Sequence, residues 1–236
     1  MTNTLGSTLV RKADFCIFPR SGKELAIPAT KTYVTQLMSI FLFSVDLALK
    51  NEENSELEDI RDGLYKAPQL LEDTLRFLNS QIRGSAERFK DKNAVFLLGS
   101  GPNYATALEG ALKIKETCRI FAEGFATREF LHGPMRLVDE RTLVIIIAPP
   151  DENDNVVRLA NSLKRFGASI ISISEKSCST TRLSECSEEV FFVSSGLPSV
   201  FSPILYVLPL QLFAYYTSIF RGLNPDKPEK LTKVVK

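Results

Sequence analysis

The sequence contains little of what metal sites, disulfide frameworks and nucleic-acid surfaces require. It has no tryptophan, one histidine, and four cysteines that form no C-x-x-C pair. A single histidine argues against a histidine-based zinc site. Its 29 basic side chains balance 28 acidic ones, so a net charge of +1 gives no electrostatic basis for binding nucleic acid or an anionic membrane. We therefore expect no metal, no cofactor and no nucleic-acid partner.

Cysteine usage and hydropathy bear on the compartment. Unpaired thiols without a recognisable signal peptide are typical of a reducing environment, and the expected location is the cytoplasm. The most apolar run, QLMSIFLFSVDLALK at 36–50, is too short to span a bilayer and contains Asp46. We interpret this run as part of a buried helix and expect no association with a membrane.

From Asn93 onward, short apolar runs alternate with amphipathic stretches. The pattern predicts strands at 94–98, 143–148, 168–173 and 190–193, and helices at 103–117, 153–166 and 201–221. Continuous Val, Ile, Leu and Phe strands separated by helices indicate a parallel sheet covered on both faces. The expected fold class is α/β, a three-layer domain whose ligands bind beyond the carboxyl ends of the strands.

The first third of the chain predicts fewer elements than a complete domain needs. It offers one strand at 15–18, a helix at about 30–50 buried on most faces, and a second leucine-rich helix kinked at Pro68. One strand and two helices cannot bury their own apolar faces. We therefore divide the chain into a partial domain with connecting helices at 1–80 and a complete domain with its tail at 81–236.

The predicted helix ALEGALKIKE, at 107–116, carries three charges on one face. At 100° per residue, Glu109, Lys113 and Glu116 lie within about 60° of one another. Such a face is either a solvated surface with an i,i+4 ion pair or a site that holds an acid beside a base. Spacing alone leaves both interpretations open.

Two other segments are ambiguous in the same way. GSGPNY, at 99–104, lacks the G-K-[ST] of a P-loop and has Tyr104 where G-x-G-x-x-G requires its third glycine. It is either a tight strand-to-helix connection or a ligand loop. His132 precedes Gly133-Pro134, so it is expected in a loop or at a helix end, as a structural residue or as a proton-transfer group.

Three stretches together resemble a known family. LGSGPNYATALEGALKIKE, FAEGFATREFLHGPMRLVD and the ending LTKVVK are similar to the isomerase half of the glutamine–fructose-6-phosphate aminotransferase (glucosamine-6-phosphate synthase) family, which is built from two sugar isomerase (SIS) domains. ELAIPATKTYVTQL, at 24–37, resembles the end of the first of these domains. The resemblance implies an SIS-type fold, with the glutaminase and most of the first SIS domain absent from this sequence.

The resemblance also implies roles for individual residues. Glu116 corresponds to the glutamate that moves a proton between C1 and C2 of the open-chain sugar, and Lys113 to a lysine of the same site. His132 corresponds to a histidine that assists ring opening and is supplied by the neighbouring subunit. Lys233 corresponds to a tail lysine that can form a Schiff base with the ketose. This chemistry requires a carboxylate over two adjacent carbons and a cation beside the developing oxyanion.

Substrate contacts follow from the resemblance, together with departures from the family pattern. Ile27 and Thr232 correspond to backbone contacts with the sugar, and Ala29 stands where the family has a serine. The segment APPDEND, at 148–154, has three acids and no hydroxyl where a phosphate loop is expected. Arg128 and Leu131 replace a customary glycine and lysine. The alternative to a phosphosugar isomerase is therefore a non-catalytic sugar-phosphate-binding module, or one half of a two-chain enzyme.

The resemblance and the apolar surface both point to assembly. A histidine supplied by the neighbouring subunit requires a two-fold dimer with shared active sites. The predicted helix at 30–50 has no complete domain of its own to cover its apolar side chains, which include Leu37, Met38, Phe41, Leu42 and Val45. We therefore expect a homodimer that binds a phosphosugar, with a separate glutaminase or first-SIS chain as a further partner.

Overall fold

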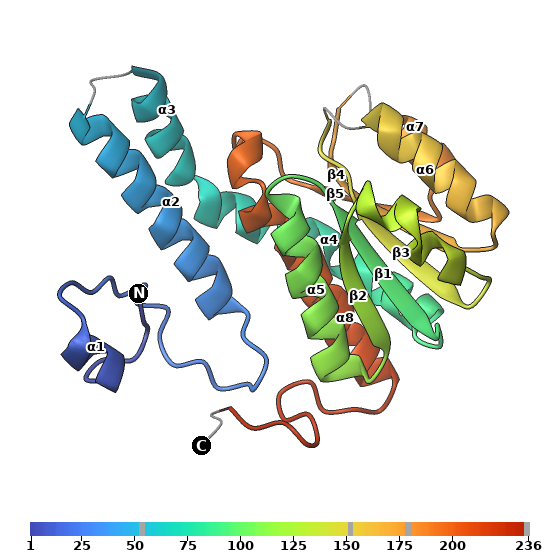
Figure 1. The fold of residues 1–236 in the computed structure, drawn as a ribbon, viewed down its shortest axis with the longest axis horizontal. Helices are drawn as coiled ribbons and strands as arrows, with labels where there is room; N and C mark the ends of the chain where they lie inside the picture. Colours follow the sequence, from blue (N-terminus) through green and yellow to red (C-terminus); the bar gives the residue numbers. More distant parts are fainter. Residues whose placement is uncertain (52–54, 151–152, 178–180, 234–236) are drawn as a thin grey trace.

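The computed structural model describes residues 1–51, 55–150, 153–177 and 181–233 (Figure 1). The order of elements is α1 (Thr8–Lys12), α2 (Lys31–Asn51), α3 (Ser55–Leu64), α4 (Ala67–Phe89), β1 (Ala94–Gly99), α5 (Asn103–Cys118), β2 (Phe121–Ala126), η1 (Glu129–His132), η2 (Pro134–Leu137), β3 (Thr142–Ile147), α6 (Asn153–Arg165), β4 (Ser169–Glu175), α7 (Thr181–Cys186), β5 (Glu189–Val193), η5 (Ser199–Phe201) and α8 (Pro203–Phe220).

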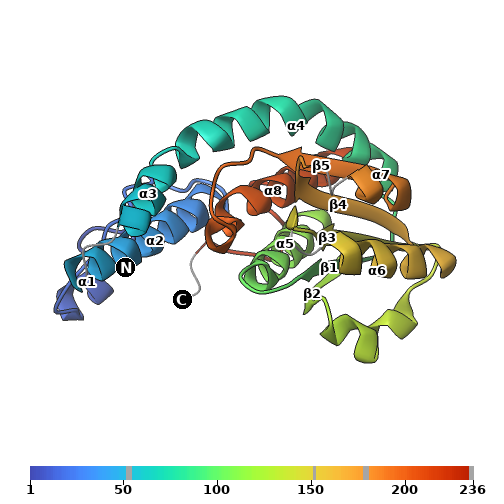
Figure 2. The same ribbon diagram turned by 90° about the horizontal axis from the view of Figure 1, so that it is seen from above.

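The five strands form one parallel sheet in the order β2-β1-β3-β4-β5. Every residue of β3 is buried, as a strand covered on both faces requires. Alternate strand residues pack against two different clusters: Leu97 and Ile145 face α4, α5 and α8, whereas Phe96 and Val144 face α6 and α7. Figure 2 shows the sheet between these two helical layers. The predicted three-layer α/β fold is confirmed.

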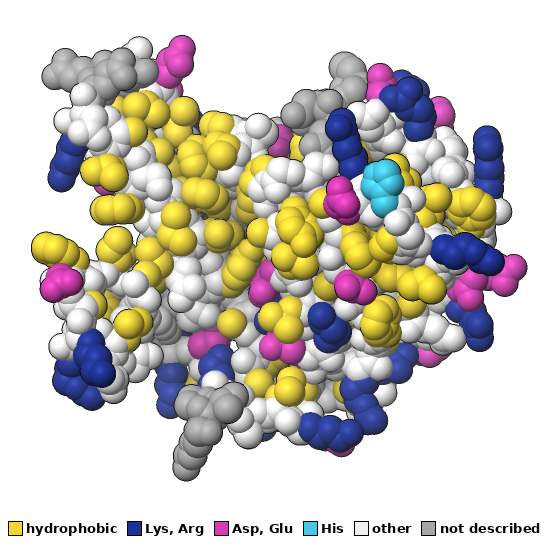
Figure 3. Space-filling model, in the orientation of Figure 1, with side chains coloured by type: hydrophobic (Ala, Val, Ile, Leu, Met, Phe, Trp, Pro, Cys, Tyr) yellow, Lys and Arg dark blue, Asp and Glu magenta, His cyan; other side chains and the backbone are white. Residues whose placement is uncertain are grey.

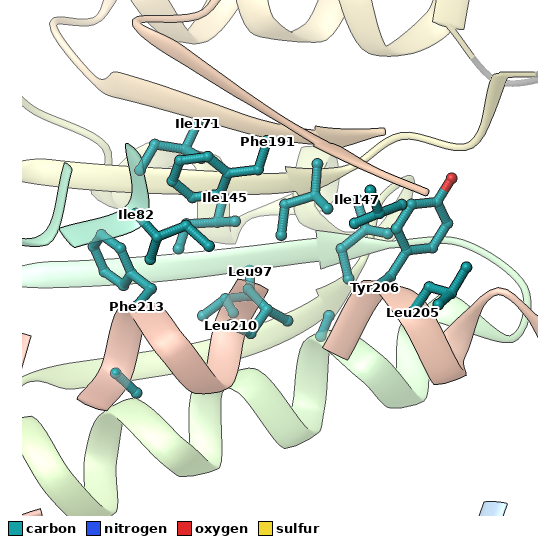
Figure 4. Close-up of a cluster of buried hydrophobic side chains, with 14 of the residues drawn as sticks. Ile82, Leu97, Ile145, Ile147, Ile171, Phe191, Leu205, Tyr206, Leu210 and Phe213 are labelled. Carbon is teal, nitrogen blue, oxygen red and sulfur yellow. The ribbon is translucent and has the colours of Figure 1, made fainter. Parts of the chain in front are cut away.

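Helix α8 fills the centre of the first layer. Its side chains Leu205, Tyr206, Leu210 and Phe213 meet strand residues of the sheet and Ile82 of α4 (Figure 4). These residues are at most 2% exposed. Burying each such apolar side chain stabilises the fold by about 1.5–3 kcal/mol relative to leaving it in water. The cluster therefore holds α4, α5 and α8 to the same face of the sheet.

Strand β2, at the edge of the sheet, was not expected. Its sequence FAEGFA places Ala122 and Gly124 inward and Phe121 and Glu123 outward. A Cβ atom at Gly124 would lie 2.7 Å from the backbone nitrogen of Leu108 in α5, so glycine permits direct contact between strand and helix. With a charge and a glycine among six residues, β2 lacks the continuous apolar run by which the other strands were predicted.

Two expectations for the first third of the chain are wrong. Residues 15–18 pair with no other strand in the described structure, and Phe15 is 92% exposed. Among the described residues no strand lies beside this segment, and its Ile17 carbonyl accepts instead from the backbone N–H of Thr2 at 3.1 Å. Pro68 does not kink a continuous helix: α3 ends at Leu64 and α4 begins at Ala67, with the proline in its first turn.

Helix α2 confirms the prediction of a helix but not of its burial. Val45 is its only buried residue, and Ile40, Phe43 and Leu47 are about half exposed. Its inner side reaches the core through Phe41, whose ring lies 4.8 Å from that of Phe201. The outer side of α2 has no cover among the described residues.

Two helical segments are long and apolar enough to cross a membrane by length and composition. These are Lys31–Asn51 and Ser199–Phe220. The second segment contains α8, a helix of the hydrophobic core, and its apolar composition matches its burial inside the protein. The predicted domain boundary at residue 80 falls within α4, which packs on α8 and β5, and it stays a prediction.

Candidate functional site

The charged face of α5 is an ion-pair cluster, with its lysine out of solvent. Lys113 is 3% exposed, and its Nζ lies 2.5 Å from Glu116 Oε2 and 3.4 Å from Glu109 Oε1. The helix periodicity predicted that the three residues share a face, and the structure confirms it. A buried ammonium between two carboxylates differs from a solvated surface pair, because desolvation strengthens the interaction of these charges.

Burial perturbs Glu109, for which the family resemblance implies a structural rather than a catalytic role. Desolvation raises the pKa of Glu109, the charge of Lys113 opposes this, and the nearby carboxylate of Glu116 adds to it. In the first turn of α2, burial and the charge of Glu109 raise the pKa of Tyr33 to about 12. The cluster therefore extends from α5 to the start of α2, which the sequence did not indicate.

The turn before α5 sets the position of this helix. A Cβ atom at Gly99 would lie 2.2 Å from the carbonyl oxygen of Asn103, and Gly101 has φ +52°. The buried Asn103 side chain donates to Ser202 Oγ at 2.9 Å and accepts from Thr106 Oγ1. GSGPNY therefore forms a tight strand-to-helix connection anchored beside α8; its interpretation as a ligand loop stays untested.

The cluster does not lie where the topology led us to expect a ligand. Helix α5 begins at the carboxyl end of β1 and returns toward the amino end of β2. Glu116 is in its last turn, about 20 Å along the helix axis from Asn103 at 1.5 Å per residue. The acid and lysine thus belong to the amino-end side of the sheet, because they come from the helix rather than from the loops that follow the strands.

A cavity of about 440 Å³ opens at this end of α5. One wall is the last turn of the helix and includes Glu116. The other wall is the chain after α8, from Gly222 to Leu231. Arg119 continues the first wall and approaches Glu229 of the second at 3.6 Å. A small polar molecule in this cavity would lie beside the Glu116 carboxylate.

The tail lysine, Lys233, contacts the loop that is predicted to bind the sugar. Lys233 Nζ donates to the carbonyl oxygens of Ala26, at 2.7 Å, and Ile27, at 3.1 Å. Ala29 is half-buried in the same loop, and Thr232 is exposed next to the lysine. Lys233 also lines a larger cavity, of about 990 Å³, with residues of the first 36 positions. The structure thus brings together Ile27 and Lys233, which are 206 positions apart.

His132 is not brought to the other predicted catalytic residues. It is exposed at the end of η1, which follows the carboxyl end of β2. Phe130 fixes this segment, with its ring 5.2 Å from that of Phe96 and 5.5 Å from that of Phe125. Because Thr127 donates to Gly99 at the start of the segment, His132 follows the edge of the sheet where α5 begins, whereas Glu116 lies where α5 ends.

Two further expectations concern a metal site and a phosphate loop. Within the ranges that the structure describes, no group of three or more His, Cys, Asp or Glu side chains could hold a metal ion. The segment at 148–154, which has three acids where a phosphate loop is expected, includes residues 151 and 152, which lie outside the described residues.

Comparison with known proteins places this arrangement in a family. Residues 88–221 match the SIS domain family. The chain belongs to the SIS domain family. All of it aligns, at 39% identity over 238 residues, with the glutamine–fructose-6-phosphate aminotransferase [isomerizing] of Thermococcus kodakarensis. The chain spans 38% of the length of that relative.

Two solved structures have a similar fold. The C-terminal domain of glucosamine-fructose-6-phosphate aminotransferase from Francisella tularensis has a TM-score of 0.87 and 30% identity, over 96% of this chain and 64% of that one. A glucosamine-6-phosphate deaminase from Thermotoga maritima has a TM-score of 0.72 and 25% identity, over 97% and 63%. The resemblance to the isomerase half, predicted from sequence, is confirmed.

Proposed function

We propose that this chain carries the isomerase chemistry of a phosphosugar ketose/aldose isomerase of the glucosamine-6-phosphate synthase type. Its substrate is fructose-6-phosphate, and its product is glucosamine-6-phosphate or glucose-6-phosphate. The observation that supports this most strongly is the buried Lys113 ammonium, 2.5 Å from the Glu116 carboxylate, at a helix end that lines a cavity. The aminotransferase relatives and the SIS fold supply the substrate class.

In this proposal each charge of the cluster has a task. Glu116 takes a proton from one of the two adjacent sugar carbons and returns it to the other. Lys113 stabilises the negative charge that develops on the enediol oxygen, an interaction that a desolvated cation makes more strongly than a hydrated one. Lys233 condenses with the ketose carbonyl to form an imine and release water. Ile27, Ala29 and Thr232 contact the sugar.

The decisive experiment removes the base and keeps its shape. Glu116→Gln should lower the isomerisation rate of fructose-6-phosphate by at least about 100-fold, the usual contribution of a general base. Glu123→Gln is the matched control, because Glu123 is an exposed acid on the edge strand β2. Assays with and without ammonium distinguish plain isomerisation from amination. Full activity of Glu116→Gln would refute the assignment of the base.

We propose a homodimer with shared active sites as the working form. His132 and Glu116 lie toward opposite ends of α5 within one chain, so a histidine that acts on the sugar comes from a second copy. Figure 3 shows hydrophobic side chains gathered over α2 and the outward face of α5, where exposed residues include Ile40, Phe43, Leu47, Tyr104, Leu108 and Leu112. Surfaces of this kind are typical of subunit interfaces.

Subunit mixing tests the shared site. Mixed His132→Ala and Glu116→Gln subunits should recover part of the activity that each variant lacks alone, because one composite site in the mixed dimer is intact. Sedimentation of the parent at micromolar concentration should show a dimer. A monomer, or no recovery from an active parent enzyme, would contradict the proposal.

The second candidate is a sugar-phosphate-binding module without catalysis, or one half of a two-chain enzyme that works with a separate glutaminase or first-SIS chain. The acidic segment at 148–154 favours this candidate, because its three carboxylates would repel the phosphate of a sugar. A sugar whose phosphate is not held in place is not oriented for reaction. Calorimetric binding of fructose-6-phosphate without turnover would support it. The similarity to a deaminase makes release of ammonia from glucosamine-6-phosphate a useful third assay. In either case we expect the protein in the cytoplasm.

A further inference from the structure

The loop at 24–32 and the tail at 224–233 are joined by hydrogen bonds that we name the clasp. Lys233 Nζ donates to the carbonyls of Ala26 and Ile27, and the Ile27 backbone N–H donates to the Asp226 carbonyl at 2.9 Å. The tail donates hydrogen bonds to the loop and the loop donates one to the tail, so these bonds hold both segments in place although they lie about 200 positions apart. We propose that Glu24 is the positioning residue that shapes the loop side of this clasp and thereby holds Lys233 at the site. The catalytic consequence rests on the proposed function.

Glu24 fixes the loop through a single carboxylate oxygen. Its Oε2 accepts from the backbone N–H of Thr30 at 3.2 Å, from that of Thr32 at 3.0 Å, and from the Thr32 hydroxyl at 2.6 Å. These bonds close the turn that contains Ala26 and Ile27 and satisfy backbone donors at the start of α2. The two carbonyls that receive Lys233 therefore lie in a segment whose ends the carboxylate ties together.

Charge supports the same geometry. Burial alone would raise the pKa of Glu24, but the hydrogen bonds from Thr32 and Thr30 and the positive charge of Lys233 outweigh it and lower the pKa. Glu24 is thus ionised at neutral pH and attracts the ammonium that its loop binds. An ammonium held by two carbonyls and a nearby carboxylate keeps its position better than one on a free chain end.

The tail side of the clasp has its own turn. Asn224 Oδ1 accepts from the backbone N–H groups of Asp226 and Lys227, at 3.0 and 3.1 Å. Such an Asx-type turn shapes the chain just before the Asp226 carbonyl meets Ile27. Asn224 also lines the cavity beside Glu116. The clasp therefore connects the tail lysine with the end of α5. Glu24 lines the same larger cavity as Lys233 and does not line the cavity beside Glu116.

Hydrogen exchange tests the clasp without any need for turnover. In Glu24→Ala, the amide of Ile27, which donates to the Asp226 carbonyl, should exchange at least about tenfold faster, because opening the clasp no longer requires the bonds to Glu24 to break. Lys233→Met should produce the same change from the other side and leaves the start of α2 intact. Asp139→Ala is the matched control, because Asp139 accepts from a backbone N–H and a threonine hydroxyl, those of Arg141 and Thr142, before β3.

Kinetics separate positioning from a merely structural effect. Glu24→Ala should lower kcat with fructose-6-phosphate about tenfold, as a displaced catalytic group does, and should have no further effect in a Lys233→Met background. Glu24→Gln keeps an acceptor but loses the charge and should restore part of both properties. Equal losses in both backgrounds, or unchanged exchange in Glu24→Ala, would overturn the proposal. If the parent protein lacks activity and Glu24→Ala still shows faster amide exchange, the proposed function is refuted and the clasp is supported.

Discussion

Helices α2 and α8 are alike in length and apolar character and differ in what covers them. Each lies in a segment that is long and apolar enough to cross a membrane, yet 61% of an 18-residue stretch of the α8 segment is buried, against 6% for α2. Helix α8 lies on the sheet between α4 and α5, whereas α2 touches the core along one side only. The contrast shows that apolar content specifies a surface to be buried, while the neighbouring elements decide whether this chain buries it.

The largest expected effect lies in the covered region. Ile145→Ala removes a fully buried side chain between the sheet and its helices and should cost about 3–4 kcal/mol of unfolding free energy, from lost transfer energy and the remaining cavity. Ile40→Ala, the same change at a half-exposed position of α2, should cost less than about 0.5 kcal/mol. Urea unfolding of both variants measures the difference. Equal losses of unfolding free energy in the two variants would contradict the difference in burial between the sheet and α2.

A glycine pair gives the next largest effect. Gly124→Ala would place a methyl group 2.7 Å from the backbone of α5, so strand and helix must separate, at a cost of about 1–3 kcal/mol. Gly63→Ala, in α3, meets no atom within 4 Å and should instead stabilise its helix by up to about 1 kcal/mol. Thermal unfolding should show opposite shifts, and a stable Gly124→Ala would mean that α5 is not held against β2.

The buried charge cluster should respond to pH. Because the pKa of Glu109 is raised in the folded state, the folded protein binds the proton more readily, and stability falls as pH rises from the unfolded pKa through the folded one. Glu109→Gln should therefore unfold at higher urea than the parent at pH 7, and the gain should vanish below about pH 4, the ordinary range of a glutamate. Glu123→Gln is the exposed control. A variant that is less stable at neutral pH would show that the ion pair with Lys113 outweighs desolvation.

The smallest effect on stability belongs to the outer side of α2. Phe43→Ser replaces a half-exposed ring and should change the free energy of unfolding of the monomer by no more than about 0.5 kcal/mol. If this face meets a second copy, the same substitution should weaken the dimer in sedimentation at micromolar concentration. A large loss of monomer stability would instead mean that α2 is covered within its own chain.

The sequence by itself determined the elements whose signals are local. The apolar runs at 94–98 and 143–148 predicted strands of a parallel sheet, since strands covered on both faces must be apolar throughout. The helical period placed Glu109, Lys113 and Glu116 on one face. Resemblance then linked Lys113 and Glu116 to a proton transfer, which spacing alone left open.

Only the tertiary structure decided the features that depend on distant neighbours. Strand β2 exists because the edge of β1 accepts it and Gly124 admits α5, although its own residues carry a weak strand signal. The isolated apolar run at 15–18 remained unpaired because no strand lies beside it among the described residues. Lys233 meets Ile27 across 206 positions, and His132 and Glu116 lie toward opposite ends of α5. Backbone geometry determines how residues close in sequence are arranged in a helix or strand. Contacts between residues distant in sequence depend instead on which surfaces of the folded elements pack against one another.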